Sequence, residues 1–392
     1  MNVPKLRFKE FNDEWKEKKL SDISLEISYG MNSASKEFDG ENKYIRITDI
    51  DETTSKYLNK DIVSPDGNLE DKYIVRKNDI LFARTGASTG KTYLYNSNDG
   101  KLYYAGFLIK ASIINHNANF IFQQTKTGKY NNWVKIMSMR SGQPGINSQE
   151  YGNYKFSITT LKEENKISNF LSLLDKKIEL QSKKIEDLKL FKKGLLIEEF
   201  RNKECNTKLS KCFTYGKAGG TPKSTNKDYY NGTIPFLSIS DITSQGKYIY
   251  KTEKTITEEG LNNSSAWLVP KKGIIVSMYA SYGLVTINNI PLSTSQATFN
   301  MIISENNNIE YIYYYLYYLY ITKYYDSIVS TGTQPNLNAE QLKNLDIYIP
   351  VIEKQNDIAN KFFTIDKRIN LEENKLDKFN QLKKGLMQSM FV

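Results

Sequence analysis

The string GASTGKT, from Gly86 to Thr92, is the part of the sequence whose residue types come closest to a phosphate-binding site. A phosphate-binding loop needs the spacing GxxxxGK[ST], which would place its first glycine at position 85, and that position holds Thr85. The residues that follow, YLYNSNDGK, predict no helix, so no helix N-terminus would face a phosphate. We therefore expect no nucleotide-binding site here.

Other residues of catalytic type also lack the spacing that a catalytic or metal site needs. Asp66 and Glu70 resemble the acidic residues of many nucleases, but both fall in one polar loop, whereas such acids usually come from separate strands around a metal. His116 is the single histidine, and the spacing of Cys205 and Cys212 fits neither a CxxC pair nor a zinc site. The chain also lacks the glycine-rich cofactor loop and the Asn/Asp-Pro-Pro-aromatic tetrapeptide of methyltransferases. We expect no catalytic residue and no metal ligand in this chain.

The composition favours a folded protein with an anionic partner. Lysine and arginine number 54 against 44 acidic residues, a net charge of +10, while 39% of residues are hydrophobic and 12% aromatic. The excess charge therefore decorates folded surface, and a polyanion is the expected partner. The longest apolar stretch, Tyr311 to Ile321, is shorter than the ~20 residues that span a bilayer, and the N-terminus lacks a signal sequence. With its two unpaired cysteines, this predicts a cytoplasmic protein.

The chain contains an internal repeat, which determines the expected architecture. QPGINSQ from Gln143 matches QPNLNAEQ from Gln334, and the same offset then holds without a gap as far as KKGL at 192–195 and 383–386. Upstream the match is weaker: YIRITDID at 44–51 pairs with FLSISDIT at 236–243, and DILFARTGASTGK pairs loosely with GIIVSMYASYGLV. The sequence therefore predicts a variable domain and a uniform helix, followed by a second copy of each.

The uniform segments have the apolar spacing of coiled-coil helices. The first seam, and its copy in the second half of the chain, predict two long helices that pack antiparallel on each other. Over Glu163 to Arg201, about 39 residues at ~1.5 Å each would form a rod of roughly 58 Å. An ordinary helical hairpin or a homo-oligomeric zipper would show the same spacing. The seam residues are Ile167, Leu171, Leu174, Ile178, Ile185, Leu188 and Leu195, then Ile358, Phe362, Ile365, Ile369, Leu376, Phe379 and Leu386, with exceptions at Gln181, Lys192, Glu372 and Lys383.

The variable segments predict mixed α/β domains. Runs such as KYIRITDID, DILFAR, TIPFLSISDI and KGIIVSMYASYG are rich in β-branched and aromatic residues and are bounded by turn residues, which indicates strands. The tyrosine-dense YIYYYLYYLYITKYYDSI aligns with NFIFQQTKTGKYNNWVKI, and we expect one half-buried helix in each domain. The predicted division is a first variable domain at 1–160, a central helix at 161–203, a second variable domain at 204–351 and a C-terminal helix at 352–392.

Loops that differ between similar domains favour recognition of a varied polymer such as DNA. Arginine and lysine donate to guanine or phosphate, and hydroxyl and amide side chains serve bases or backbone. For any single loop residue, a turn-stabilising hydroxyl or a solvated charge is an equally good explanation. The candidate DNA-contacting residues are Arg46, Thr48, Arg84, Ser88, Thr89, Lys91, Arg140 and Gln143 in the first half, and Lys217, Thr221, Lys223, Ser238, Ser240, Ser277, Tyr279, Ser281, Tyr282 and Gln334 in the second.

Over essentially its whole length the sequence resembles the specificity subunits of type I restriction-modification enzymes. The motifs that carry the resemblance are KKLSDI, GGTPKSTNKDYYNGTIPFLSISDI, DILFARTGASTGK, GTQPNLN, and the LDKKIE and IDKRIN helices that end in KKGL. The first domain lacks the GGTP opening, and YAGFLIKA from Tyr104 matches STSQATF from Ser293 only faintly.

The resemblance implies a DNA-binding subunit without catalytic activity that recognises a bipartite target, each domain contacting one half-site in the major groove, about one helical turn (~34 Å) apart. It implies two methyltransferase subunits and restriction subunits as partners, with S-adenosylmethionine, ATP and Mg²⁺ bound by those subunits and none by this chain. The helix residues expected to dock partners are Lys177, Lys184, Lys193, Arg368, Lys375 and Lys384. Two alternatives stay open: a coiled-coil scaffold that binds only proteins, and a self-sufficient DNA-modifying enzyme.

Overall fold

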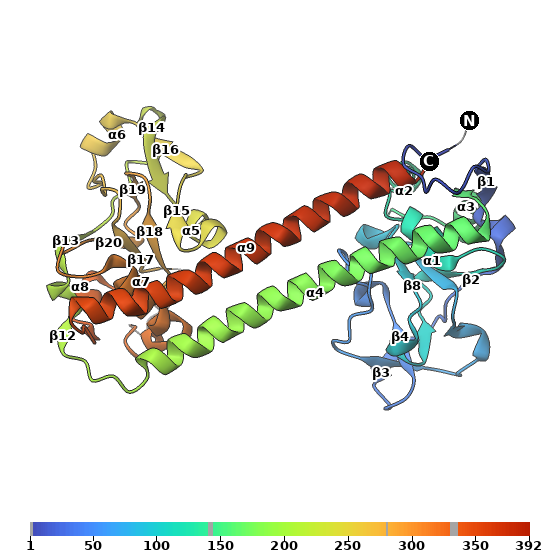
Figure 1. Ribbon diagram of the computed structural model, residues 1–392, viewed down its shortest axis with the longest axis horizontal. Helices are drawn as coiled ribbons and strands as arrows, with labels where there is room; N and C mark the ends of the chain where they lie inside the picture. Colours follow the sequence, from blue (N-terminus) through green and yellow to red (C-terminus); the bar gives the residue numbers. More distant parts are fainter. Residues whose placement is uncertain (1–2, 140–143, 280, 330–335) are drawn as a thin grey trace. The chain divides into compact units, whose positions relative to one another are not determined.

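The computed structural model describes residues 3–139, 144–279, 281–329 and 336–392 (Figure 1). The chain divides into two compact units, the first formed by residues 1–181 and 375–392 and the second by residues 182–374. Each unit contains a mixed α/β domain and one segment of each of two long helices, α4 (Leu161–Phe200) and α9 (Ile352–Met390). The predicted fold class, two mixed α/β domains with two long helices, is therefore confirmed.

The first domain is built on an antiparallel sheet with the strand order β2-β10-β7-β8. Successive strand residues point to opposite faces. Ile80 and Phe82 of β7 therefore pack in the core that includes α1, whereas Leu81 and Ala83 pack in a second core with the β4-β9-β6 sheet. The strands of this unit are β1 (Lys16–Lys19), β2 (Ser24–Tyr29), β3 (Ala34–Glu37), β4 (Lys43–Ile45), β5 (Val63–Asp66), β6 (Ile74–Val75), β7 (Asp79–Ala83), β8 (Thr92–Leu94), β9 (Leu102–Tyr104), β10 (Leu108–Ile113) and β11 (Lys155–Ile158).

The second domain repeats this arrangement with the order β13-β20-β17-β18-β15. In the main sheets, β2 pairs with β10, the strand before α1, and β13 pairs with β20, the strand before α7. Each domain also has a smaller sheet with one parallel pair, β4 with β9 and β14 with β19. The strands are β12 (Thr207–Lys208), β13 (Phe213–Ala218), β14 (Tyr230–Leu237), β15 (Tyr248–Ile249), β16 (Lys254–Ile256), β17 (Ile274–Ser277), β18 (Val285–Asn288), β19 (Ser293–Thr294), β20 (Thr298–Ile303) and β21 (Asp346–Ile347).

Short helices cap and connect the strands. The α-helices are α1 (Ala118–Gln124), α2 (Gly128–Ser138), α3 (Ser148–Asn153), α5 (Ile239–Gln245), α6 (Glu258–Asn262), α7 (Ile309–Ile321) and α8 (Ala339–Lys343). The 3₁₀ turns are η1 (Leu20–Ile23), η2 (Ile47–Asp49), η3 (Asp71–Tyr73), η4 (Gly86–Ser88), η5 (Ser97–Asp99), η6 (Leu209–Lys211), η7 (Lys227–Tyr229) and η8 (Tyr324–Ser327). Within the described ranges, no helix combines the length and the apolar character needed to cross a membrane.

Two local predictions were wrong. The segment that aligns with the tyrosine-rich helix α7 forms two helices in the first domain, α1 and α2, because Thr127 caps a new helix, its side chain accepting from Tyr130 N. In the segments KYIRITDID (43–51) and TIPFLSISDI (233–242), which the sequence predicts as strands and turns, the strands end early: strand β4 ends at Ile45 before η2, and β14 ends at Leu237 before α5. Ser238 begins α5 with a capping box to Asp241, a signal that the sequence carries as SxxD.

In each unit the segments of α4 and α9 run antiparallel. In the first unit Asp175 of α4 pairs with Lys383 of α9 at 2.5 Å, and in the second Lys192 pairs with Asp366 at 2.5 Å and Glu199 with Lys361 at 2.9 Å. Residue numbers rise along α4 as they fall along α9. The two pairs Asp175–Lys383 and Lys192–Asp366 are copies of each other at equivalent positions of the repeat. Lys192 and Lys383, the exceptions in the predicted seam, are therefore the residues that hold the helices in register.

Apolar residues of the two long helices, some of them outside the predicted seam, complete the core of each domain. Ile167 and Leu171 of α4 and Met387 and Met390 of α9 share one core with the first-domain sheet and α1. Leu196, Phe200, Ile358, Ala359 and Phe362 share another with β17, β20 and α7. Glu372, a further seam exception, is buried and accepts from Lys184 at 3.0 Å and Arg368 at 2.9 Å. Each domain is thus closed by helix segments from distant parts of the chain.

A matched polar contact anchors each domain to the start of its long helix. Glu164 is fully buried, accepts from Asn117 N at 2.9 Å and lies 2.8 Å from His116 Nδ1. At the repeat position Gln355 accepts from Asn308 N at 2.9 Å and donates to Asn307 at 3.2 Å. His116 therefore has a counterpart, Asn307, and it joins α1 to α4.

We predict that replacing Glu164 by Ala destabilises the first unit by about 1–3 kcal/mol, because the buried Asn117 N–H loses its acceptor. The double substitution His116→Asn with Glu164→Gln, which installs the residue pair of the second unit, should retain most of that stability. Denaturant unfolding of the full chain measures both. Equal losses in the two variants would show that this hydrogen bond does not anchor the domain.

Candidate DNA-contacting loops

The first candidate loop, residues 84–89, forms the end of a hairpin between β7 and β8. Ala83 N donates to Lys91 O at 2.8 Å and Gly90 N to Ala83 O at 3.0 Å, which closes the hairpin. Arg84 is held on both sides of its backbone, since its N donates to Phe107 O at 3.0 Å and its O accepts from Ile146 N at 2.8 Å. The base of the loop is therefore rigid.

The second candidate loop, residues 278–282, has the same frame. Ser277 N donates to Leu284 O and Gly283 N to Ser277 O, both at 2.8 Å, while Met278 N donates to Ala297 O and Met278 O accepts from Leu337 N. Met278 therefore occupies the place of Arg84, and Gly283 that of Gly90, so this loop is one residue shorter. Both glycines have positive φ, and a Cβ on Gly283 would lie 2.2 Å from the Tyr325 ring.

Arg84 lies among exposed aromatic residues. Its guanidinium carbon lies 4.8 Å from the centre of the Tyr29 ring, and the Tyr29 hydroxyl accepts from Ser148 N at 3.0 Å. Partial burial desolvates this hydroxyl, but the bond from Ser148 and the charge of Arg84 outweigh that cost and lower the pKa of Tyr29. Phe107, whose carbonyl holds Arg84 N, is 59% exposed. The result is a small cationic and aromatic surface.

The second domain carries different residues at each of these three positions. By strand register and hydrogen bonding, Met278 is the second-domain equivalent of Arg84. Ala297 is likewise the equivalent of Phe107, and Ala218 that of Tyr29. Met278 is buried, so its side chain is part of the core. The two domains thus keep the backbone frame and change the surface.

A family model confirms that this repeat is a known domain in two copies. The model described as "Type I restriction modification DNA specificity domain" matches residues 12–190 and again residues 205–381. The chain belongs to this family. The two matches cover both candidate loops, so each loop lies within its own specificity domain.

Individual relatives and solved structures agree with this assignment. The chain is 25% identical over 425 residues to the type I restriction enzyme HindI specificity subunit of Haemophilus influenzae, covering 86% of this chain and 90% of the relative. Its fold is similar to the S subunit of a type I restriction-modification system from M. genitalium, with a TM-score of 0.59, 15% identity and coverage of 100% and 99% of the two chains. A chain from a structure on complex assembly of the type I R-M system has a TM-score of 0.62, 16% identity and coverage of 96% and 97%.

The structure also gives a local counterpart for the GGTP opening of the second specificity domain. Gly219 N donates to Thr298 O and Gly220 N to Thr294 O, and in the first domain Gly30 N donates to Leu108 O and Met31 N to Tyr104 O. A Cβ would lie 2.2 Å from a neighbouring oxygen at both Gly30 and Gly219. The first domain therefore keeps the first glycine of the motif, which sequence comparison missed. Its YAGFL segment corresponds to the segment that ends at Thr298.

The other candidates in the first loop have mixed environments. Thr89 Oγ1 donates to Gly86 O at 2.7 Å, which stabilises the turn. Ser88 is half-buried within η4, and Lys91 lies 3.8 Å from the exposed Glu52. Their role in DNA binding stays a prediction.

Arg46 and Ser238 sit at matching strand ends and have structural partners. Arg46 forms a two-bond ion pair with Asp49 at 2.8 and 2.9 Å, which raises the pKa of Arg46. Ser238 caps α5 through Asp241 and contacts Ser240 Oγ at 2.8 Å. Thr48 and Ser240 lie beside them, and both are exposed. These contacts give Arg46 and Ser238 a role in stabilising the local turn and helix start.

Further candidates in the second domain lie on β13 and the loops near it. Lys217 and Lys223 extend from exposed positions, and Thr221 Oγ1 donates to Gln296. Tyr279 is exposed, Ser281 has a φ of 59°, and Tyr282 donates to Asp326 at 2.9 Å. Ser277 is buried, and its hydroxyl donates to Tyr279 O at 2.7 Å, which makes it a loop support. Arg140, Gln143 and Gln334 lie outside the described residues.

The predicted docking residues on the helices divide into two groups. Lys177 lies 4.6 Å from the Phe379 ring and Lys184 pairs with Glu372, so these two join α4 to α9, whereas Arg368 pairs with Glu372 within α9. The second group is Lys193, Lys375 and Lys384, of which Lys193 and Lys384 are repeat copies. Their role in docking stays a prediction.

The segments considered for catalysis have other roles in the structure. GASTGKT leads into strand β8 and not into a helix, as expected from its sequence. Asp66 ends strand β5, and Glu70 pairs with Lys72 in an exposed loop. Across the described part of the chain, no three His, Cys, Asp or Glu residues are grouped to hold a metal ion.

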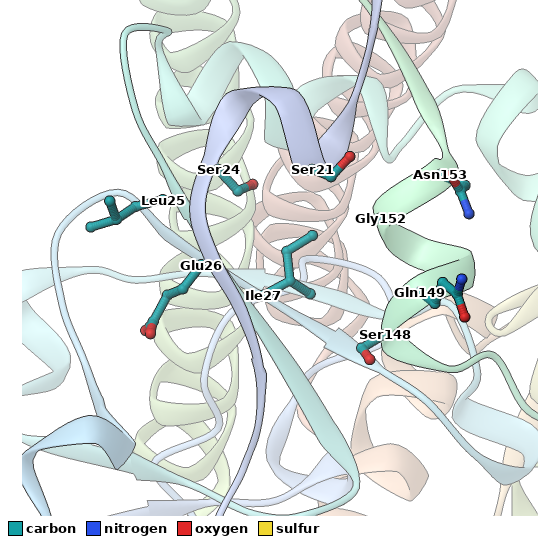
Figure 2. A pocket seen from close by; sticks show the side chains of 9 residues that line it. All are labelled: Ser21, Ser24, Leu25, Glu26, Ile27, Ser148, Gln149, Gly152 and Asn153. Carbon is teal, nitrogen blue, oxygen red and sulfur yellow. The ribbon is translucent and has the colours of Figure 1, made fainter.

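A groove of about 430 Å³ between β2 and α3 is lined by Ser21, Ser24, Leu25, Glu26, Ile27, Ser148, Gln149, Gly152 and Asn153 (Figure 2). Its one acidic residue, Glu26, pairs with Lys110.

A partly buried lysine, Lys126, contacts strand β8 and is influenced by charges on α4 and α9. Lys126 Nζ donates to Thr92 Oγ1 at 2.9 Å and to Ser55 Oγ. Desolvation, together with the charge of Lys383, lowers the pKa of Lys126 to about 7, although Asp175 opposes both. Lys126 thus supports Thr92, which follows the loop. Burying Lys126 has a desolvation cost that is present only while its amine is protonated.

We predict that this cost makes the first unit more stable as pH rises from about 7 to 9. Below pH 7 both the folded and the unfolded chain carry the proton on Lys126. Above pH 7 the folded state loses it while the unfolded state, whose lysine pKa is near 10.5, keeps it, so the unfolded state binds more protons and stability increases with pH. Substituting Lys126→Met should remove this increase. Unfolding free energies of both proteins at pH 6, 7, 8 and 9 test it, and parallel profiles would contradict it.

Proposed function

We propose that this chain recognises a bipartite DNA sequence as the specificity subunit of a type I restriction-modification complex, each specificity domain contacting one half-site. The observation that carries the proposal is the double match to the DNA specificity family, joined to two loop frames with equal hydrogen bonding and different surface residues. Equal frames present each loop in the same way. Different residues on them give two different half-sites.

The net charge of the chain supports DNA as the partner. A charge of +10 favours association with the phosphate backbone, which supplies affinity without sequence information. We propose that catalysis belongs to partner subunits: modification subunits that bind S-adenosylmethionine, and restriction subunits that use ATP and Mg²⁺. This chain would then supply recognition alone.

The repeated helices support two copies of one modification subunit as partners. Leu180 and Phe191 of α4 are both exposed, and their spacing corresponds to about three turns of ~3.6 residues each, so they lie on one face of that helix. Their repeat copies on α9, Leu371 and Leu382, are exposed as well. Single exposed apolar residues are common on proteins, but a pair kept in both copies suggests a surface that is covered in the complex. Two equal surfaces fit two equal subunits.

Exchanging residues 17–142 for the matching segment of another family member tests modular recognition. We expect one half-site of the methylated sequence to change and the other to stay, because each loop frame lies within one domain. The measurement is a map of methylated adenines in a host that carries the whole system. A change in both half-sites, or in neither, would refute the proposal.

Assays on the purified chain, with and without partner subunits, test the two alternative functions, a protein-binding scaffold and a self-sufficient DNA-modifying enzyme. A scaffold that binds only protein would show no salt-dependent shift of labelled duplex in the presence of partner subunits, whereas a DNA-binding subunit would show a steep one. A self-sufficient enzyme would modify DNA when the purified chain receives Mg²⁺ and S-adenosylmethionine alone.

We predict that Leu180→Asp combined with Leu371→Asp weakens capture of modification subunits by at least about tenfold, since each substitution places a charge in an apolar contact. Leu25→Asp, at an exposed apolar residue of β2 outside α4 and α9, is the matched control. Co-purification and analytical ultracentrifugation give the stoichiometry. If the double variant still assembles with two modification subunits, the helix surface is not the docking site.

A further inference from the structure

Among the described arginines of the first unit, Arg84 differs from Arg7, Arg46 and Arg76 in having no acidic partner. Arg7 pairs with the buried Glu163 at 2.7 Å, Arg46 with Asp49 at 2.8 Å and Arg76 with Asp71 at 3.7 Å. Within residues 3–139 and 144–181, Arg84 alone among the arginines makes no ion pair, and its side chain donates no hydrogen bond to another described residue. Its guanidinium donors are therefore available to a ligand.

The same arginine is held in a defined position. Its backbone is fixed at N by Phe107 O and at O by Ile146 N, and its guanidinium lies over the Tyr29 ring. The ring is fixed in turn, because Ser148 N donates to its hydroxyl. An arginine that is ordered before binding loses less side-chain entropy on contact, so its planar group meets a ligand in one orientation.

The surroundings of Arg84 suit the edge of a base more than a phosphate. Tyr29, whose ring lies under the guanidinium, is 40% exposed, and Phe107, whose carbonyl accepts from Arg84 N, is 59% exposed, so the partners of Arg84 are uncharged aromatic residues. A planar donor pair in a fixed plane matches O6 and N7 of guanine in the major groove, the commonest specific contact of arginine. Arginine also pairs with phosphate in this way, so the preference for a base rests on the fixed position of Arg84 against the exposed Tyr29 ring.

We propose that Arg84 contacts a guanine in the half-site of the first specificity domain and that Tyr29 positions it. This inference rests on the proposed function. The second domain cannot use the same contact, because the buried Met278 occupies the matching position and residues 205–351 contain no arginine. Its half-site must be recognised through lysine, tyrosine, amide and hydroxyl side chains.

The test uses the full chain co-expressed with its modification subunits and a plasmid library in which the first half-site is randomised. Methylation is read by sequencing for the wild type and for Arg84→Ala, Arg84→Lys, Tyr29→Leu and Tyr29→Phe. Arg76→Ala is the matched control, because it removes one positive charge from the same domain outside the loop. Thermal unfolding of each variant reports on folding.

We expect one G·C pair of the first half-site to lose its selectivity in Arg84→Ala and in Arg84→Lys, by roughly tenfold or more, while every other position is retained. Tyr29→Leu should reduce selectivity at that same pair, Tyr29→Phe should preserve it because the ring remains, and Arg76→Ala should leave it unchanged. A merely structural role of Tyr29 would affect all positions together.

Three results would overturn the inference: a first half-site without a G·C requirement, a loss in Arg84→Ala that is equal for all sequences, or full selectivity in Arg84→Lys. The proposed function fails differently, since the wild-type complex would then methylate no bipartite sequence.

Discussion

The antiparallel contact between α4 and α9 is the constraint on which each domain depends. Leu171 and Met387 belong to one core although they come from opposite halves of the sequence, and Phe200 and Phe362 meet in the other. Neither sheet is covered until a helix segment from a distant part of the chain packs on it. Burial of these helix residues contributes to the core of each domain, so each domain and its helix segments stabilise one another. Independent excision of either domain would expose part of its core.

The polar residues within that seam add specificity to the apolar contact. Uniform apolar packing would tolerate a shift by one heptad, whereas Lys192 must meet Asp366 and Lys383 must meet Asp175. In the second unit the contact extends outward, since Tyr314 donates to Asp366 at 2.6 Å and Lys247 lies among Asp366, Glu310 and the rings of Tyr313 and Tyr314. Desolvation lowers the pKa of Lys247, and the two acids oppose it. Helix register and domain position are thus fixed by the same charges.

The two candidate loops differ in their side chains although their backbone hydrogen bonds are the same. The hairpins that carry Arg84 and Met278 have the same backbone hydrogen bonds, and the glycines at their ends adopt the same positive φ. Bonds between backbone atoms make no demand on side chains, so loop residues can change without loss of the fold. The exchange of Tyr29, Arg84 and Phe107 for Ala218, Met278 and Ala297 shows how far this goes within one chain. A family that needs many specificities on one architecture benefits from such a division.

The sequence by itself determined the repeat, the two long helices, the α/β class and the absence of the spacing that known catalytic motifs need, because periodicity and motif spacing are local properties of the chain. It also placed the first loop, since DILFAR and the glycines after it mark a strand and a turn. It could not show that Arg46 is bound to Asp49, that the helix predicted after His116 breaks at Thr127, or that Gly30 matches Gly219. Nor did it single out Tyr29 and Phe107, whose link to Arg84 runs through strands β2 and β10. Those facts depend on which strands pair and which side chains meet across the sheet. Only tertiary packing decides that, because its contacts join residues whose separation in sequence carries no signal.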